Sequence, residues 1–236
     1  MTNFDSILAG ATVSPAVFEQ HPDYAAVLIT VLGLEVGASQ LNTDALLAAA
    51  ESKTAELLAQ ASLEDLPQVK VWREKFASMG LKPRDARSSF EALMRRAEGG
   101  LPRIDPLTDL YNAVSVSYQI PVGGEDLDRY FGSPQLVVAD GTETFDAREN
   151  GELVLVHPAP GEIVWRDDQG VTCRRWNWRQ CVRTRITPET RNALFIFDGA
   201  GPDSVGLAEA AAAEFVTHLQ QLWPMAVIEQ RTISLA

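Results

Sequence analysis

The sequence predicts an α+β fold, because helical and strand-like patterns occupy different parts of the chain. Residues 43–119 carry apolar side chains at helical spacing together with capping and stop signals. Residues 135–197 consist of short apolar runs separated by turn signals, which is typical of antiparallel or mixed sheets. The chain has 236 residues, no internal repeat and no long linker, so we expect one domain spanning residues 1–236.

The N-terminal region is predicted to add a strand and a helix to this domain. Residues 25–32 form a continuous apolar run rich in β-branched side chains, which indicates a strand buried on both faces. A helix is expected to begin at Thr43 or Asp44 and to end near Ala61. Residues 1–65 are therefore expected to form an extension that packs on the core of the fold.

Two further helices are predicted from apolar spacing and from the glycines that follow them. One spans residues 67–79, with Trp72 and Phe76 on one face. The other spans residues 88–97 and ends in two arginines, which suit the negative end of the helix dipole.

The segment 106–119 fits both a strand and a helix. Val114 and Val116 belong to an alternating pattern, but apolar residues also recur at helical spacing through the whole segment. Asp105 is a favourable N-cap, and Pro106 suits the first helical position. We therefore predict a helix.

Polar residues on this helix lead towards a pair of glycines. Asn112, Ser115 and Gln119 share one side of the predicted helix, and Gly123 and Gly124 follow shortly after it. Such a stripe is either a solvated face or part of a site. Paired glycines allow another group to approach the backbone closely.

The second half of the chain is predicted to be mainly sheet. Turn signals such as Asp140-Gly141 and Asn150-Gly151 separate its apolar runs. Residues 198–202 are expected to connect the last strand to a closing helix over 205–222, with Ser204 as a plausible cap. The predicted strands cover residues 136–138, 153–156, 163–165, 171–174 and 193–197.

Charge argues against a protein that coats nucleic acid. The formal net charge is −12, but most Lys and Arg residues lie in 70–105 and 166–191. Sixteen of the 20 basic residues are Arg, whose guanidinium group holds phosphate or carboxylate in a fixed geometry. The sequence therefore allows a local anion site, or alternatively arginines that pair with the surplus carboxylates.

Several classes of protein lack support in the sequence. The longest apolar run, residues 25–34, falls well short of the about 20 residues that cross a bilayer, and no secretory signal begins the chain. We expect a cytoplasmic protein with no membrane partner. Cys173 and Cys181 have no additional ligands near them, so neither a metal site nor another cofactor is predicted. Serine-hydrolase, nucleotide-binding and zinc-protease motifs are absent.

The most unusual stretch spans residues 174–180. It combines aromatic faces, guanidinium cations and amide donors, which are groups that hold an aromatic ring, a nucleobase or a carboxylate. The alternative is an exposed hairpin in which Arg stacks on Trp for local order. The residues are Arg174, Arg175, Trp176, Asn177, Trp178, Arg179 and Gln180.

Several motifs together resemble the free-standing B3/4 domain proteins, which are similar to the editing domain of the bacterial phenylalanyl-tRNA synthetase β subunit. The resemblance covers about residues 70–223. It implies a three-layer β/β/α domain that hydrolyses mischarged aminoacyl-tRNA without a metal or a covalent intermediate. The motifs are LPRIDPLTDLYNAVS at 101–115, PVGGED at 121–126, GEIV at 161–164, RRWNWR at 174–179 and TPET at 187–190.

The resemblance also assigns roles to individual positions. Asn112 matches the Asn of the family's Asp-x-x-Asn helix, with Asp109 as the acid, and Asp126 matches the acid that closes the next motif. Gly123 stands where the synthetase domain has His, so the resemblance does not carry tyrosine selectivity over to this chain. The rest of a synthetase is absent, so the chain is not expected to aminoacylate.

The first functional hypothesis is a deacylase that acts in trans on mischarged tRNA. Asn112, Ser115 and the amides of Gly123 and Gly124 would orient the water and the ester carbonyl. Asp126 is expected in the same site. The side chains expected to contact the amino acid or the terminal phosphates are Arg174, Arg175, Trp176, Asn177, Trp178 and Arg179.

Two other functions remain open at this point. One is a non-catalytic module that binds a free amino acid or a similar small carboxylate, with Arg179 as the carboxylate partner. The acidic net charge favours this module over tRNA binding. The other is a protein–protein adaptor. No DNA partner is expected, and the oligomeric state is not predicted.

Overall fold

The computed structural model describes residues 3–37, 42–97 and 99–235 and confirms the α+β fold class. The helices are α1 (Asn3–Ala9), α2 (Pro15–Gln20), α3 (Asp44–Gln60), α4 (Pro67–Ser78), α5 (Ser89–Ala97), α6 (Pro106–Tyr118) and α7 (Ser204–Leu222), with short 3₁₀ helices η1 (Leu63–Asp65) and η2 (Leu127–Arg129). The first strands are β1 (Thr12–Val13), β2 (Tyr24–Leu32), β3 (Val122–Asp126), β4 (Gln135–Val138), β5 (Phe145–Glu149) and β6 (Glu152–Val156). The remaining strands are β7 (Ile163–Arg166), β8 (Val171–Arg174), β9 (Arg179–Gln180), β10 (Asn192–Ala200) and β11 (Val227–Ser234).

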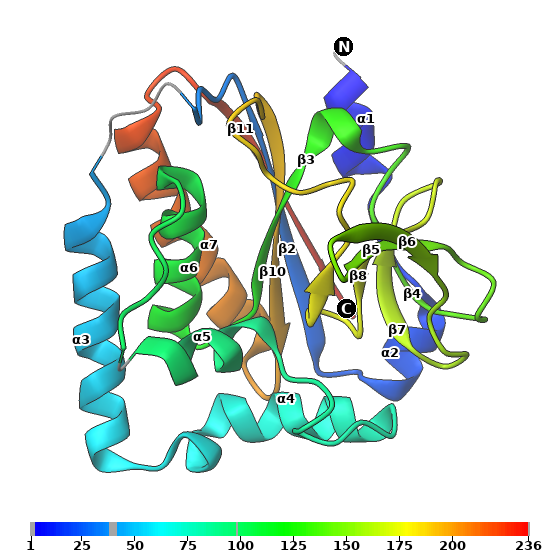
Figure 1. Ribbon diagram of the computed structural model, residues 1–236, viewed down its shortest axis with the longest axis horizontal. Coiled ribbons are helices and arrows are strands. Elements are labelled where there is room, and N and C mark those ends of the chain that lie inside the picture. Colours follow the sequence, from blue (N-terminus) through cyan, green and yellow to red (C-terminus); the bar gives the residue numbers. More distant parts are fainter. Residues whose placement is uncertain (1–2, 38–41, 98, 236) are drawn as a thin grey trace.

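The elements form three layers (Figure 1). A four-stranded sheet in the order β11-β2-β10-β3 occupies the middle, and all of its pairings are antiparallel. Helices α3, α6 and α7 lie on one side of it. On the other side lies the five-stranded sheet β1-β4-β7-β8-β9, which is mixed because β1 pairs parallel with β4. Strands β5 and β6 form a separate hairpin.

The two inner strands of the middle sheet, β2 and β10, are buried on both faces. Alternate side chains of a strand point to opposite faces, so β2 contributes to two cores at once. Val27 and Ile29 pack with α6 and α7, whereas Ala26 and Leu28 belong to the core between the two sheets. The prediction of a doubly buried strand from residues 25–32 is confirmed, and β2 lies inside the sheet between β11 and β10.

The ambiguous segment before the paired glycines is helical, as predicted. The Asp105 carboxylate caps α6 by accepting hydrogen bonds from the backbone amides of Leu107 and Thr108 at 3.0 and 2.8 Å. Asn112 and Ser115 are buried, so the polar stripe is not a solvated face.

Some local predictions were wrong or incomplete. The predicted cap Ser204 is the first residue of α7, and Asp203 occupies the N-cap position without a capping side-chain bond. Strand β10 continues beyond the predicted end at Phe197 to Ala200. The elements α1, β1, α2, β3, β5, β9 and β11 were not predicted. In the described part of the chain, no helix has the length and apolar character needed to cross a bilayer.

We predict that Asp105→Ala lowers the free energy of unfolding by about 1 kcal/mol, because two amides at the start of α6 lose their acceptor. The matched control is Asp203→Ala, which removes an N-cap aspartate that makes no capping bond. Denaturant unfolding of both variants tests the prediction. Equal losses in the two variants would contradict the role given to the Asp105 cap.

Candidate functional site

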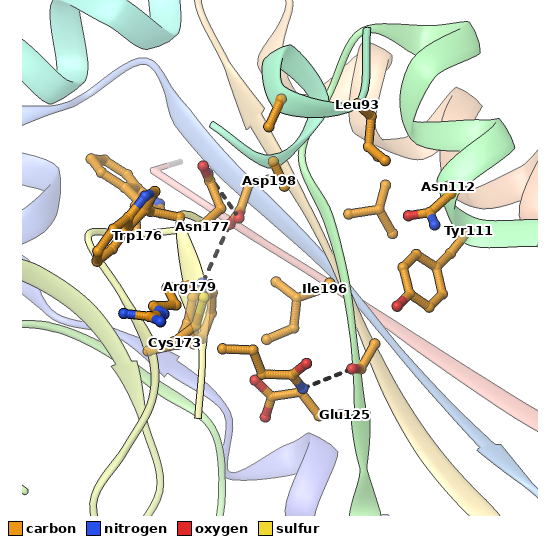
Figure 2. Close-up of a pocket in the computed structure, with 18 of the residues that line it drawn as sticks. Leu93, Tyr111, Asn112, Glu125, Cys173, Trp176, Asn177, Arg179, Ile196 and Asp198 are labelled. Atoms are coloured by element: carbon orange, nitrogen blue, oxygen red, sulfur yellow. Dashed lines mark hydrogen bonds between the residues drawn. The ribbon is translucent and has the colours of Figure 1, made fainter. Parts of the chain in front are cut away.

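A cavity of about 300 Å³ lies beside β3, the edge strand of the middle sheet (Figure 2). Its lining comes from β3 and β10, from α5 and α6, and from β7, β8, β9 and the turn between β8 and β9. These segments are far apart in the sequence, so the site forms only when both sheets and the helices assemble. Most of its walls are apolar, and they include Leu93, Tyr111, Val122, Trp165, Trp176 and Ile196.

Asn112 presents an unused amide group to this cavity. Its side chain is 7 % exposed and lines the pocket. Within the described residues, no hydrogen-bond partner for this amide is found, and Figure 2 shows the group facing the cavity. A carboxamide can both donate and accept hydrogen bonds. Asn112 is therefore available to position a ligand.

Across the cavity lies a buried carboxylate held by neutral donors. Asp198 accepts hydrogen bonds from Tyr24 Oη at 2.6 Å, from Asn177 Nδ2 at 3.2 Å and from Trp165 Nε1 at 3.4 Å. Burial raises the pKa of Asp198 to about 6, against the lowering effect of these bonds. The group is thus mostly ionised at neutral pH. It forms no ion pair with any side chain that the structure describes.

Glu125 places a second carboxyl group at the cavity. It is buried on β3, and burial raises its pKa to about 8, so the group is mostly protonated at neutral pH. Its Oε2 atom has no hydrogen-bond partner in the described structure. The cavity therefore contains one ionised and one neutral carboxyl group under the same conditions.

The two glycines of β3 lie in different steric surroundings. A Cβ atom added to Gly124 would lie 2.8 Å from side-chain atoms of Ile186 and Phe195 and 3.0 Å from Tyr111, so glycine is required by packing. A Cβ added to Gly123 would meet no atom within 4 Å. Gly123 therefore leaves open space in the lining of the cavity.

The Arg/Trp stretch is a tight turn between β8 and β9 that divides its side chains between the core and the surface. Arg175 and Trp176 adopt left-handed backbone conformations, with φ of 48° and 64°. Trp176 is fully buried against Tyr24 and Trp72. Trp178 lies at the cavity, with the Arg175 guanidinium 4.2 Å from its ring centre. Arg stacks on Trp as in the alternative interpretation, but the turn is not an exposed hairpin, because Trp176 and Asn177 are buried and line the cavity.

The structure brings most of the predicted site residues together but not all of them. The cavity is lined by Asn112, Gly123, Gly124, Trp176, Asn177, Trp178 and Arg179. Ser115 lies outside the lining, and its hydroxyl donates to the carbonyl of Ile120 at 2.6 Å. Asp126 also lies outside and accepts a hydrogen bond from Thr190 Oγ1 at 2.7 Å. These two side chains are used within the fold.

Two predicted arginines also lie outside the lining. Arg174 forms an ion pair with Glu162 at 2.7 Å. Arg175 stacks on Trp178 and donates to the carbonyl of Asp85 at 3.1 Å. Many other arginines pair with acids as well, so the salt-bridge interpretation of the basic segments holds for a large part of them.

A second hollow of about 330 Å³ adjoins the cavity and is lined with arginines. It shares Arg96, Trp178 and Arg179 with the cavity and adds Arg84, Asp85 and Arg87. Arg84 pairs with Asp85 at 3.6 Å, and Arg87 pairs with Glu91 at 3.8 Å. Arg96 and Arg179 form no ion pair with the residues described. An apolar pocket thus leads into a cationic hollow on a chain whose net charge is −12.

Sequence reasoning missed Glu125, Asp198 and Arg96. Asp198 was read as part of a connection, although an acid that directly continues a buried apolar run was a usable signal. Arg96 was assigned only to the end of a helix. Its position beside Arg179 depends on the packing of α5 against the turn between β8 and β9, which no local pattern contains.

Comparison with known proteins gives the family. The B3/4 domain pattern matches residues 71–220, so the chain belongs to the B3/4 domain family. An N-terminal fragment of the phenylalanyl-tRNA synthetase β-subunit from Pyrococcus horikoshii is similar in structure, with 16 % sequence identity and a TM-score of 0.47. The match covers 92 % of this chain and 49 % of that one, so this chain spans about half its length. No curated protein sequence matches.

We predict that Gly124→Ala destabilises the protein by about 1–3 kcal/mol, because the new methyl group would press against the buried Phe195 ring. The matched change Gly123→Ala meets open space and should alter the free energy of unfolding far less. Thermal unfolding of both variants measures the difference. A similar loss in both would contradict the open space assigned to Gly123.

Glu125→Gln is predicted to change how stability depends on pH. The pKa of Glu125 is raised in the folded state, so the folded protein keeps a proton that the unfolded chain has lost. Its contribution to stability is therefore present at low pH and is lost as pH rises from about 4.5 to about 8. Glutamine does not ionise, so the variant does not lose stability through this group as pH rises. It should therefore become more stable relative to wild type as pH increases. Unfolding curves from pH 5 to 9 test this, and parallel profiles would contradict it.

Proposed function

We propose that this protein acts in trans to hydrolyse the ester bond of mischarged aminoacyl-tRNA. The observation that carries the proposal is the unpaired Asn112 amide inside an apolar pocket that adjoins a cationic hollow. The resemblance of the chain's motifs to the synthetase editing domain supports the same reaction. In this proposal the whole chain acts as one domain in the cytoplasm, with residues 70–223 as its family core.

In the proposed reaction, water attacks the ester carbonyl carbon and the ribose oxygen leaves with a proton. The products are a free amino acid and an uncharged tRNA. The Asn112 amide would donate to the carbonyl oxygen as negative charge develops there, or orient the water through its own oxygen. Ser115 lies outside the cavity, so Asn112 and the backbone beside Gly123 are the groups that we assign to the reacting ester.

The two hollows suit the two ends of such a substrate. The apolar walls would enclose the amino-acid side chain, with Gly123 leaving space where the synthetase domain has His. The arginines of the adjoining hollow would bind the phosphates near the tRNA 3′ end, since guanidinium groups match phosphate geometry. Arg84, Arg87 and Arg96 join Arg179 in this role, in place of Arg174 and Arg175.

The test is deacylation of a panel of correctly and incorrectly charged tRNAs by wild type and by Asn112→Ala. We expect hydrolysis of a subset of the mischarged tRNAs and a loss of about 10²–10³-fold in kcat in the variant, as for removal of one oxyanion donor. Asn150→Gly is the matched control, because Asn150 lies in the turn between β5 and β6 with φ of 52°. Unchanged hydrolysis by Asn112→Ala would overturn the assignment.

The alternative function is a non-catalytic module for a free amino acid. The observation that favours it is Arg179, whose guanidinium lies at the cavity and forms no ion pair with a described residue. It could hold a carboxylate directly. The dependence of binding on salt distinguishes the two functions. Binding of tRNA through several phosphates weakens steeply with ionic strength, whereas binding of a small ligand weakens only mildly. Each lost phosphate contact reduces the slope of log binding constant against log salt concentration by about 0.7.

The discriminating experiment measures binding of uncharged tRNA and of free amino acids at several salt concentrations. For the deacylase, Arg96→Ala and Arg179→Ala should weaken tRNA binding and flatten its salt dependence. Arg148→Ala is the control, because Arg148 donates only to the carbonyl of Gly151 in the outer hairpin. Tight binding of a free amino acid with no ester hydrolysis would favour the module.

A further inference from the structure

We infer that Asp198 and Asn177 form a recognition site for a protonated primary amine at the buried end of the cavity. In the proposed function, on which the identity of the ligand rests, this amine is the α-amino group of the amino acid.

Asp198 is buried without a cation among the described residues to balance its charge. It is 3 % exposed, and its three hydrogen-bond partners, Tyr24, Trp165 and Asn177, are all neutral. A buried carboxylate is costly unless a cation compensates its charge. A carboxylate can accept about four hydrogen bonds, so this group has acceptor capacity left for a ligand.

Asn177 beside Asp198 has an unsatisfied side-chain oxygen. Its side chain is 8 % exposed and lines the cavity. The amide nitrogen donates to Asp198 Oδ2, which fixes the orientation of the group and leaves Oδ1 without a partner among the described residues. Buried polar atoms usually have hydrogen-bond partners, so an exception at a pocket points to a missing donor.

Both groups are acceptors, and this determines the kind of ligand. An ammonium group brings a positive charge and three donors, whereas a carboxylate or a phosphate would be repelled by Asp198. Asp198 forms no ion pair with a described residue, and Lys75, whose Nζ lies 5.9 Å from the centre of the Trp176 ring, already pairs with Asp23 at 2.7 Å. The charge of Asp198 is therefore left to the ligand.

The position of the pair also fits the proposed substrate. Figure 2 shows Asn177 and Asp198 across the cavity from Asn112. The amine and the acyl carbonyl of an amino acid are close together but point in different directions. Asp198 and Asn177 would bind the amine while Asn112, on the other side, hydrogen-bonds the carbonyl. The bound amine would thereby orient the ester relative to Asn112.

The test compares ligands that differ only in the amine. Amides of amino acids with apolar side chains are titrated into the full chain beside their N-acetylated partners, which lack the positive charge. We expect the amines to bind at least tenfold more tightly than the N-acetyl compounds. Asn177→Ala and Asp198→Asn should abolish this preference, whereas the exposed Asp140→Asn should keep it. Equal binding of amine and N-acetyl compounds by wild type, which needs no variant to fold, would overturn the inference.

A second measurement separates this inference from the proposed function. Mischarged tRNA and its N-acetylaminoacyl form are hydrolysed in parallel, each rate being divided by its uncatalysed rate. Faster enzymatic hydrolysis of the free-amine form supports both ideas. Equal acceleration of the two forms overturns the amine site and leaves the deacylase. No hydrolysis, with amides that still bind more tightly than their N-acetyl partners, overturns the deacylase and supports the amine site.

Discussion

The pairing of β2 with β10 is the interaction on which the rest of the structure depends. Both strands have nine residues, and they pair antiparallel along their whole length. Each strand sends alternate side chains into the helical core and into the core between the sheets, so a shift of one residue would exchange these faces. The same register places Ile196 and Asp198 at the cavity. The geometry of the candidate site is therefore a consequence of sheet pairing.

The cavity and the adjoining hollow present opposite charges to a ligand, although the protein as a whole is acidic. The buried side of the cavity contains an ionised carboxylate that neutral donors hold, and the adjoining hollow contains four arginines against the single acid Asp85 in the described structure. A ligand with a cationic end and an anionic end matches this separation. Apolar walls between the two strengthen both interactions, because charges are poorly screened where water is excluded.

Much of the fold could be predicted because its signals are local. The apolar run of β2 and the cap at Asp105 identify a strand and a helix without knowledge of their partners. The unusual Arg/Trp stretch also indicated a site from local sequence alone, because its aromatic, cationic and amide side chains are consecutive. The role of Asp198 could not be read in this way, because it depends on Tyr24 and Asn177, which are distant in sequence. Strand β11 was missed because it is a partly exposed edge strand with a mixed pattern.

The position of β2 has a consequence for how the chain folds. This inner strand (Tyr24–Leu32) is made long before its neighbours β10 (Asn192–Ala200) and β11 (Val227–Ser234). The sheet cannot close until both neighbours have left the ribosome, and its contacts are of the long-range kind associated with slow folding. Until then, an apolar segment with two unpaired edges stays exposed, and chaperones that bind such segments would protect it from aggregation.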